Sequence, residues 1–270
     1  MQARKVAAFF IRDLLWELSY PLNFFWRGSN IVLSLITFYF LGYLVAGSTA
    51  GYLASYGSGT YFPFVLVGLA LASFQGVALT SITYAIQHGM YTGTLEAMLV
   101  TPTSLSTIVF ASVLYQFVSS LLSILLFVLF GALLFDFSLA EANLLSAAVM
   151  LILTLLAHLP MGIFSASFLL IFKRGDPLTQ LVGNFSSLLG GVFFPLAVLP
   201  GWLQMVSFFL PFTHALEGLR QAVLNGRSLM ELTTQVAVLG IFAAVLLPLS
   251  LLLFSYAVHQ AKRLGTLSQF

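Results

Sequence analysis

Six long runs of apolar residues dominate this chain of 270 residues and constrain what it can fold into. A helix needs about 20 mostly apolar residues to cross the roughly 30 Å hydrocarbon core of a membrane. Runs of about this length cover residues 30–54, 61–87, 107–135, 143–172, 178–194 and 232–259, and the fifth is the shortest. The pattern predicts an all-α membrane protein with six transmembrane helices.

The composition excludes several classes of soluble protein. Only 7% of the residues are charged, with ten Lys or Arg against eight Asp or Glu, whereas about 25% is usual in a globular domain. An ordinary cytosolic enzyme, a disordered protein and a nucleic-acid binder with a basic patch are therefore excluded. The chain has no Cys, which excludes disulfides, thiol catalysis and Cys-based metal sites, and its four widely separated His residues predict no metal site.

The basic residues predict the orientation, because Lys and Arg are retained on the cytoplasmic side of short loops. With six spans, one side of the membrane receives Arg4, Lys5, Arg12, Arg27, Lys173, Arg174, Lys262 and Arg263, which is eight of the ten basic residues. Only Arg220 and Arg227 fall on the other side. We therefore expect a multi-pass protein of the cytoplasmic (inner) membrane with both termini in the cytoplasm.

Residues 4–19 have the pattern of an amphipathic helix that precedes the first span. One face carries Ala7, Phe10, Ile11, Leu14, Leu15 and Leu18; the other carries Lys5, Arg12, Asp13 and Glu17, together with Phe9 and Trp16. Such a helix lies in the headgroup region, and the two aromatic residues on its polar face indicate a protein partner. A simple topogenic flank is the alternative. The predicted organisation is this helix and its flank over 1–29, followed by one transmembrane domain over 30–270.

The predicted spans contain almost no chemistry. Their clear polar candidates are Gln75, Gln116, His158 and Asn184, and we expect His158 to bond a carbonyl freed by the proline at 160. The scarcity of intramembrane carboxylates disfavours ion-coupled transport and lipid-modifying catalysis. None of the three lysines fits a phosphate-binding loop. No cofactor is expected on this chain, and any ATP-driven activity requires a separate ATPase.

The loop 88–106, on the predicted cytoplasmic side, lacks Lys and Arg and has Glu96 as its one formal charge. Residues 94–100 are predicted to form a short helix that presents Leu95, Met98 and Leu99 on one face and ends before Pro102. This is the kind of surface that fits a groove on a partner protein. An ordinary interfacial turn is an equal alternative on composition alone.

Two stretches of the sequence resemble the permease subunits of type-2 ATP-binding-cassette exporters. One is Gly-Thr-Leu-Glu-Ala-Met-Leu-Val-Thr-Pro over 93–102, and the other includes Leu-Pro-Gly-Trp-Leu over 199–203 and Leu-Pro-Phe-Thr-His-Ala-Leu-Glu-Gly-Leu-Arg over 210–220. With the six spans and the amphipathic helix, the resemblance covers nearly the whole chain. It is specific for the family and unspecific for the substrate.

The resemblance implies a half-transporter. Two copies of this subunit, or this one and a homologous one, would pair in the bilayer above two copies of a separate ATPase that holds ATP and Mg; nucleic acid is not a partner. The helix 4–19 would be the connecting helix. The coupling contacts to the ATPase would be Gly93, Thr94, Leu95, Glu96, Met98, Leu99 and Pro102.

The second and fifth spans would line the translocation path. Small or polar residues recur in them at helical steps: Ser73, Gly76, Thr80 and Thr83, then Gln180, Asn184 and Ser187. On the residues alone, such stripes indicate either close helix packing or a weakly polar path.

Residues 195–231 would form short re-entrant helices that cover the exit as a lid, with Pro200, Trp202, Pro211, His214, Glu217 and Arg220 as its candidate residues. The spacing of Glu217 and Arg220 predicts an ion pair on one helix face. Capping-box spacing at Ser138/Glu141 and at Ser228/Glu231 predicts the starts of the fourth and sixth spans.

The predicted function is therefore the membrane subunit of an ATP-driven exporter, without an enzymatic site of its own. The path candidates are neutral and the chain is rich in aromatic residues, so a hydrophobic or amphiphilic substrate is expected: a drug, a lipid-linked molecule or a polysaccharide. A secondary carrier or channel that works without ATP is the alternative, and an intramembrane lipid-modifying enzyme is the weakest candidate.

Overall fold

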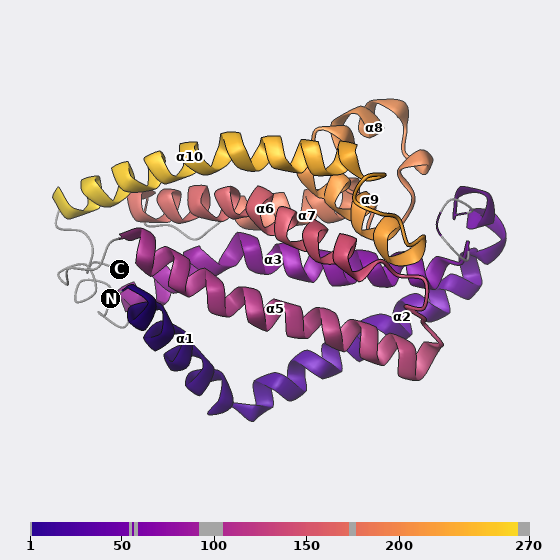
Figure 1. Cartoon of the computed structure of the whole chain (residues 1–270), viewed down its shortest axis with the longest axis horizontal. Helices are drawn as coiled ribbons and strands as arrows, with labels where there is room; N and C mark the ends of the chain where they lie inside the picture. The colour runs from indigo at the N-terminus through magenta and orange to yellow at the C-terminus, as the bar shows by residue number, and fades with distance from the viewer. Residues whose placement is uncertain (1, 54–55, 57–58, 92–104, 173–176, 264–270) are drawn as a thin grey trace.

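The computed structural model describes residues 2–53, 56, 59–91, 105–172 and 177–263, and the described residues form helices joined by short connections. The long helices are α2 (Pro21–Leu53), α3 (Tyr61–Tyr91), α5 (Leu105–Phe135), α6 (Leu144–Phe172) and α10 (Thr233–Arg263). The shorter ones are α1 (Gln2–Leu18), α7 (Pro177–Leu189), the 3-10 turn η1 (Leu196–Val198), α8 (Gly201–Phe208) and α9 (Pro211–Leu224). The long helices run roughly along one axis, and α8 and α9 lie at one end of the bundle (Figure 1).

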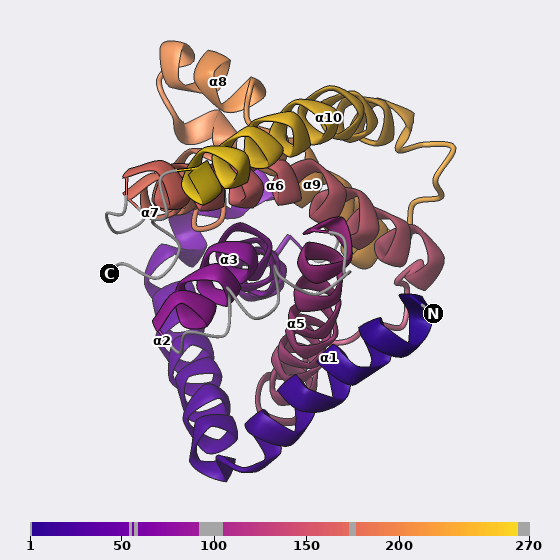
Figure 2. The same ribbon diagram turned by 90° about the vertical axis from the view of Figure 1, so that its left-hand side faces the viewer.

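The helix α3 lies at the centre of the bundle. It contacts α2 and α5 on one side and α6, α7 and α9 on the other (Figure 2). In its most apolar window 67% of the residues are buried, against 11% to 44% in the other long helices. The core joins Phe74 of α3 to Met150 of α6 and Phe212 of α9, each at most 1% exposed. The remaining helices therefore carry the apolar surface that faces lipid.

Four of the predicted spans coincide with long helices. The runs 61–87, 107–135, 143–172 and 232–259 fall within or nearly within α3, α5, α6 and α10. The outer surfaces of α5, α6 and α10 carry exposed leucines, such as Leu133, Leu145 and Leu252, each 70% exposed. An exposed apolar belt of this extent suits hydrocarbon rather than water. The chain is a multi-pass membrane protein.

The first span begins earlier than the sequence pattern predicts. The chain turns at Ser19 and Tyr20, and α2 then starts at Pro21, where proline suits the first helical turn because its missing N–H would have no helical partner. The predicted boundary at residue 29 lies inside this helix. Phe25 and Trp26 are 66% and 69% exposed and extend the lipid-facing surface. The helix therefore includes the polar residues on either side of them, Asn23 and Arg27, which the sequence pattern had placed outside the span.

The predicted fifth span, 178–194, is occupied by a short helix. With 13 residues, α7 is about 20 Å long at 1.5 Å per residue, which is less than the hydrocarbon thickness. The chain leaves it at Gly190 and Gly191, and Gly191 has a φ of +84°, a conformation that favours glycine. Within the described residues, five helices are long and apolar enough to span a membrane, and α7 is not among them.

The two predicted capping boxes have different outcomes. At the start of α6, the Oδ1 of Asn143 accepts the N–H of Ser146 at 3.0 Å, so Asn143 is the cap and the prediction of a Ser138/Glu141 box is wrong. Asn143 stands immediately before the helix, where its short side chain reaches the free N–H groups. Before α10, the carboxylate of Glu231 accepts the backbone N–H and the hydroxyl of Ser228, both at 2.8 Å. These bonds form the Glu231 half of the predicted box, and they close the turn that precedes Thr233, the first residue of α10.

Candidate functional site

The predicted coupling contacts, from Gly93 to Pro102, lie outside the described residues. The helices on either side of this segment are placed: α3 ends at Tyr91 and α5 begins at Leu105. Both ends lie at the end of the bundle where α1 begins and α10 finishes (Figure 1).

The path candidates on α3 and α7 lie on adjacent helices. Gly183 of α7 sits against Leu79 of α3, with the position of an added Cβ 3.9 Å from the leucine Cδ1. Beside this contact, Ser73 and Thr80 of α3 and Gln180 and Asn184 of α7 are exposed. Close helix packing and a weakly polar path thus both have support: a small residue of α7 packs against α3, and the neighbouring polar side chains are exposed.

The individual path candidates differ in what they offer. The hydroxyls of Ser73, Thr80 and Ser187 donate to carbonyls of their own helices, at 2.8, 2.9 and 2.9 Å, so little polarity is left for a substrate. Gly76 is partly buried, and Thr83 is 3% exposed, which turns Thr83 away from the open face. The amides of Gln180 and Asn184 are therefore its most polar groups.

The buried His158 has a different partner from the one predicted. Its Nδ1 donates to the carbonyl of Thr154 at 2.8 Å, whereas the carbonyl freed by Pro160 would be that of Leu156, four residues before the proline. Its ring lies edge-on to Phe212, with centroids 6.1 Å apart. The residue joins α6 to α9 in the core. Among the described residues, no group of three or more His, Cys, Asp or Glu is placed to hold a metal ion.

The predicted lid consists of two unequal parts at one end of the bundle (Figure 1). The helix α8 is mostly exposed: Pro200 precedes it, and Trp202 is 68% exposed. The helix α9 is mostly buried, from Pro211 in its first turn to Gln221. His214 joins the two parts, because its Nε2 donates to the carbonyl of Phe208 at 2.8 Å. Only α8 is thus free of the core.

Arg220 of α9 is the most deeply placed charged side chain of the lid, at 3% exposed. Its Nε and Nη2 donate to the carbonyl of Phe64 at 3.1 and 3.0 Å, and Nη2 also donates to the carbonyl of Val192 at 3.2 Å. The guanidinium carbon lies 3.3 Å from the ring centroid of Phe64, where the electron-rich ring face attracts a cation. Arg220 therefore fastens α9 to α3 and to the chain after α7. The pairing with Glu217 is not formed.

Glu217 faces a different neighbour. Its Oε2 accepts the hydroxyl of Tyr56 at 2.6 Å, and its Oε1 accepts the Nε2 of Gln221 at 2.8 Å. Arg220 is drawn instead to backbone carbonyls, which a planar fork of donors satisfies well. Burial, and then the Glu217 carboxylate, raise the pKa of the Tyr56 phenol, so this hydroxyl remains a donor at neutral pH. The contact ties α9 to the connection between α2 and α3.

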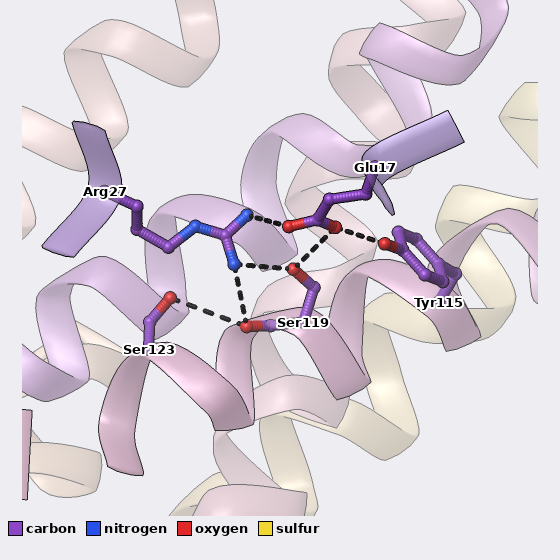
Figure 3. Close-up of polar contacts among 5 residues, drawn as sticks. All are labelled: Glu17, Arg27, Tyr115, Ser119 and Ser123. Atoms are coloured by element: carbon purple, nitrogen blue, oxygen red, sulfur yellow. Dashed lines mark hydrogen bonds and ion pairs between the residues drawn. The ribbon is translucent and has the colours of Figure 1, made fainter. Parts of the chain in front are cut away.

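A second polar cluster fastens α1 to the bundle (Figure 3). The Oε1 of Glu17 forms an ion pair with Nη2 of Arg27 at 2.8 Å, while its Oε2 accepts the hydroxyl of Tyr115 on α5. The Nη1 of Arg27 donates to the hydroxyl of Ser119 at 2.9 Å. Phe10 adds an edge-on contact with Tyr115, with centroids 5.4 Å apart. We call Glu17, Arg27, Tyr115 and Ser119 the α1 clamp.

The sequence reasoning missed the α1 clamp. It treated Arg27 as a topology signal and Glu17 as part of a polar face. A usable signal was present: Tyr115 and Ser119 are four residues apart in an apolar run, so they share one helix face, and a charged pair occurs within reach of the membrane surface. Only the fold, however, brings Tyr115 and Glu17 together across 98 residues.

The sequence matches the model of a known protein family. A model of the ABC-2 type transporter family matches residues 15–224, from the last turn of α1 to the end of α9. A search among curated proteins finds no match to the chain.

Proposed function

The chain belongs to the ABC-2 type transporter family, and on that premise we propose that two copies of it form the membrane pathway of an ATP-driven exporter. The family supplies the membrane component of ATP-binding-cassette transporters and has no ATPase site. The observation that carries the proposal is the family match over residues 15–224, which includes the last turn of α1, the helices α3 and α7, and α8 and α9 of the lid.

In the proposed mechanism, two copies of a cytoplasmic ATPase bind ATP and Mg and receive residues 93–102, with Glu96 and the Leu95, Met98 and Leu99 face as contacts. Both termini lie in the cytoplasm, and α7 with the chain after it completes a sixth crossing. ATP-driven closure of the ATPase tilts the bundle between two states. In this mechanism α1 is the connecting helix that also contacts the ATPase. The α1 clamp supports that role, because it links α1 to α5, the helix that follows the coupling segment.

The cargo is proposed to be hydrophobic or amphiphilic and to move outward across the inner membrane, between two facing copies of α3 and α7. The exposed Gln180 and Asn184 support this site, since they add weak polarity to an apolar surface. The lid, above all the exposed α8, covers the exit. A secondary carrier is the competing proposal. It would transport along an ion gradient and would not respond to ATP depletion.

Cysteine cross-linking tests the pairing of two copies, because the chain has no Cys of its own. We expect Asn184→Cys to give a disulfide-linked dimer in membranes and Leu252→Cys, a control at another exposed position on α10, to give none. A conjugate of another mass would indicate a homologous partner subunit. A dimer formed only by the control would contradict the α3 and α7 seam.

Transport itself is tested in inside-out vesicles that hold the chain and its ATPase. We expect ATP-dependent accumulation of cargo, abolished when Leu95 and Glu96 are both changed to Ala, with the chain still inserted. Transport that persists without any ATPase would overturn the proposal and support the carrier.

A further inference from the structure

A large cavity lies between the second half of α2, the start of α3 and the ends of α5 and α9, and has a volume of about 1170 Å³. It is lined by aromatic rings from α2, α3 and the end of α5, and by the connection from α5 to α6. This volume is at the upper limit of small-molecule sites, which are concave, mostly apolar and furnished with a few polar groups. The cavity is within one subunit and is separate from the α3 and α7 face.

One wall of the cavity is a cluster of aromatic rings centred on Tyr39. Its ring centroid lies 4.5 Å from that of Phe135, 5.4 Å from that of Phe62 and 5.3 Å from that of Tyr43. The hydroxyls of Tyr39 and Tyr43 are 3.0 Å apart and hydrogen-bonded. Packed rings hold their positions and present faces that attract both apolar groups and cations.

Two acidic residues, Asp136 and Glu141, belong to the lining, with Thr60 and Asn225 as its neutral polar residues near the start of α3 and the end of α9, and no Lys, Arg or His contributes to it. In the described part of the chain, neither carboxylate has an ion-pair partner within 4.0 Å. Asp136 has a φ of +54°, a left-handed conformation that Asp and Asn adopt more readily than most residues. The carboxylates therefore give the cavity a negative charge that no basic side chain in its lining offsets.

Neither basic side chain at this end of the bundle lines the cavity. Arg220 is held against Phe64, Val192 and the ring of Tyr56. Arg227 is exposed and, among the described residues, has no ion-pair partner within 4.0 Å. A ligand in the cavity thus meets aromatic faces and two carboxylates, which is the chemistry that binds an organic cation with an apolar body and disfavours an anion of the same shape.

We propose that this cavity binds hydrophobic organic cations. The rings of Tyr39, Phe62 and Phe135 contact the apolar body, and Asp136 and Glu141 balance the charge. If the chain is an exporter, as proposed above, the site makes hydrophobic organic cations its cargo. Only this role in transport rests on the proposed function. Binding itself requires neither ATP nor the ATPase.

The test compares two probes of matched size and opposite charge, tetraphenylphosphonium and tetraphenylborate. Binding is measured at equilibrium on the full chain in lipid nanodiscs, with protein-free nanodiscs subtracted. We expect the phosphonium to bind at least about tenfold more tightly than the borate. Equal binding of the two ions, on the unmodified chain, would overturn the proposal.

Variants then locate the site. The double change Asp136→Asn and Glu141→Gln keeps the shape of the lining, and Asn tolerates the left-handed backbone at 136. We expect it to weaken phosphonium binding about tenfold and to strengthen borate binding, because the same two charges attract the cation and repel the anion. Glu231→Gln, an exposed carboxylate near the same end that does not line the cavity, is the matched control. Unchanged phosphonium binding by the double variant would overturn the assignment.

Failure here can be told apart from failure of the exporter function. Loss of ATP-dependent transport in vesicles with phosphonium binding intact would contradict the exporter alone. Absence of phosphonium binding with ATP-dependent transport intact would contradict the cavity alone.

Discussion

Arg220 and Arg27 each fasten one helix to another, but in opposite surroundings. Arg220 is 3% exposed, and its donors meet the backbone carbonyls of Phe64 and Val192. The side chain of Arg27 is 31% exposed and pairs with Glu17, itself 22% exposed. Water can replace the partners of Arg27 when the pair opens, whereas nothing replaces those of Arg220. The comparison indicates a permanent fastening in the lid and a releasable one at α1.

Replacing Arg220 should have the largest effect. Arg220→Ala removes three buried hydrogen bonds to the carbonyls of Phe64 and Val192, and the contact with the ring of Phe64, so we expect a loss of about 3 kcal/mol in the free energy of unfolding. Thermal unfolding in detergent measures it, with the exposed Arg227→Ala as the control. Arg220→Lys should recover only part of the loss because an ammonium cannot reproduce the planar fork. Equal stability of the two Ala variants would contradict a permanent fastening.

Gly68 of α3 lies against the contact between Arg220 and the carbonyl of Val192. A Cβ at Gly68 would lie 2.8 Å from the carbonyl oxygen of Val192 and 3.0 Å from Nη2 of Arg220. Gly68→Ala should therefore destabilise the protein by about 1–3 kcal/mol through overpacking. Gly76→Ala, in the same helix with nothing within 4 Å of its added Cβ, is the control and should be neutral or stabilising. A stable Gly68→Ala variant would show that the lid contact can shift.

The α1 clamp should contribute less to stability than Arg220. A double-mutant cycle with Glu17→Gln and Arg27→Gln should give a coupling energy of about 1 kcal/mol or less, because both groups are partly screened by solvent. Asp13→Asn, which breaks the neighbouring exposed pair with Arg12, is the control and should change almost nothing.

A transport assay distinguishes a contact that transmits motion through α1 from one that only adds a little stability. If α1 transmits the motion of the ATPase, Glu17→Gln should reduce ATP-driven transport more than it reduces thermal stability, and exchange of the two charges (Glu17→Arg with Arg27→Glu) should restore part of it. Full transport by Glu17→Gln would leave the α1 clamp as a structural contact only.

The smallest effect is expected at the turn before α10, where Ser228 donates to Glu231. Hydrogen bonds from Ser228 lower the pKa of the exposed Glu231 below its ordinary value of 4.5. Because the folded-state pKa is the lower one, this stabilisation is present above pH 4.5 and is lost as the pH falls through the folded-state value. Glu231→Gln should lower stability near neutral pH and narrow its difference from the wild type in acid. The control is Glu141→Gln, which removes another exposed carboxylate and leaves the bonds between Ser228 and Glu231 in place.

Much of the fold could be predicted because membrane spans are a property of local composition. A run of about 20 apolar residues has no stable place except hydrocarbon or a core, so the runs at 61–87 and 107–135 coincide with α3 and α5. An apolar run predicts a span less well when its length is close to the minimum of about 20 residues. At 178–194, α7 ends before Gly190 and Gly191: Gly190 packs closely against Phe212 of α9, and Gly191 has a φ of +84°.

The candidate site divides in the same way. Periodicity placed Gln180 and Asn184 on one face of their helix, and both are exposed there. It also placed Thr83 with the open stripe, but packing of α3 at the centre of the bundle buries that residue. The spacing of Glu217 and Arg220 predicted an ion pair, and the tertiary partners Tyr56 and Phe64 were stronger competitors.

The sequence by itself determined that this chain is a helical membrane protein of the ABC-2 type, because scarce charge, apolar runs and the loop motifs are all local in the chain. The tertiary structure alone decided which polar groups work together. Arg220 meets Phe64 across 156 residues and Glu17 meets Tyr115 across 98, and the cavity gathers Tyr39, Asp136 and Glu141 from separate segments. Interaction energies depend on distance in space and on burial, and neither is written in residue order.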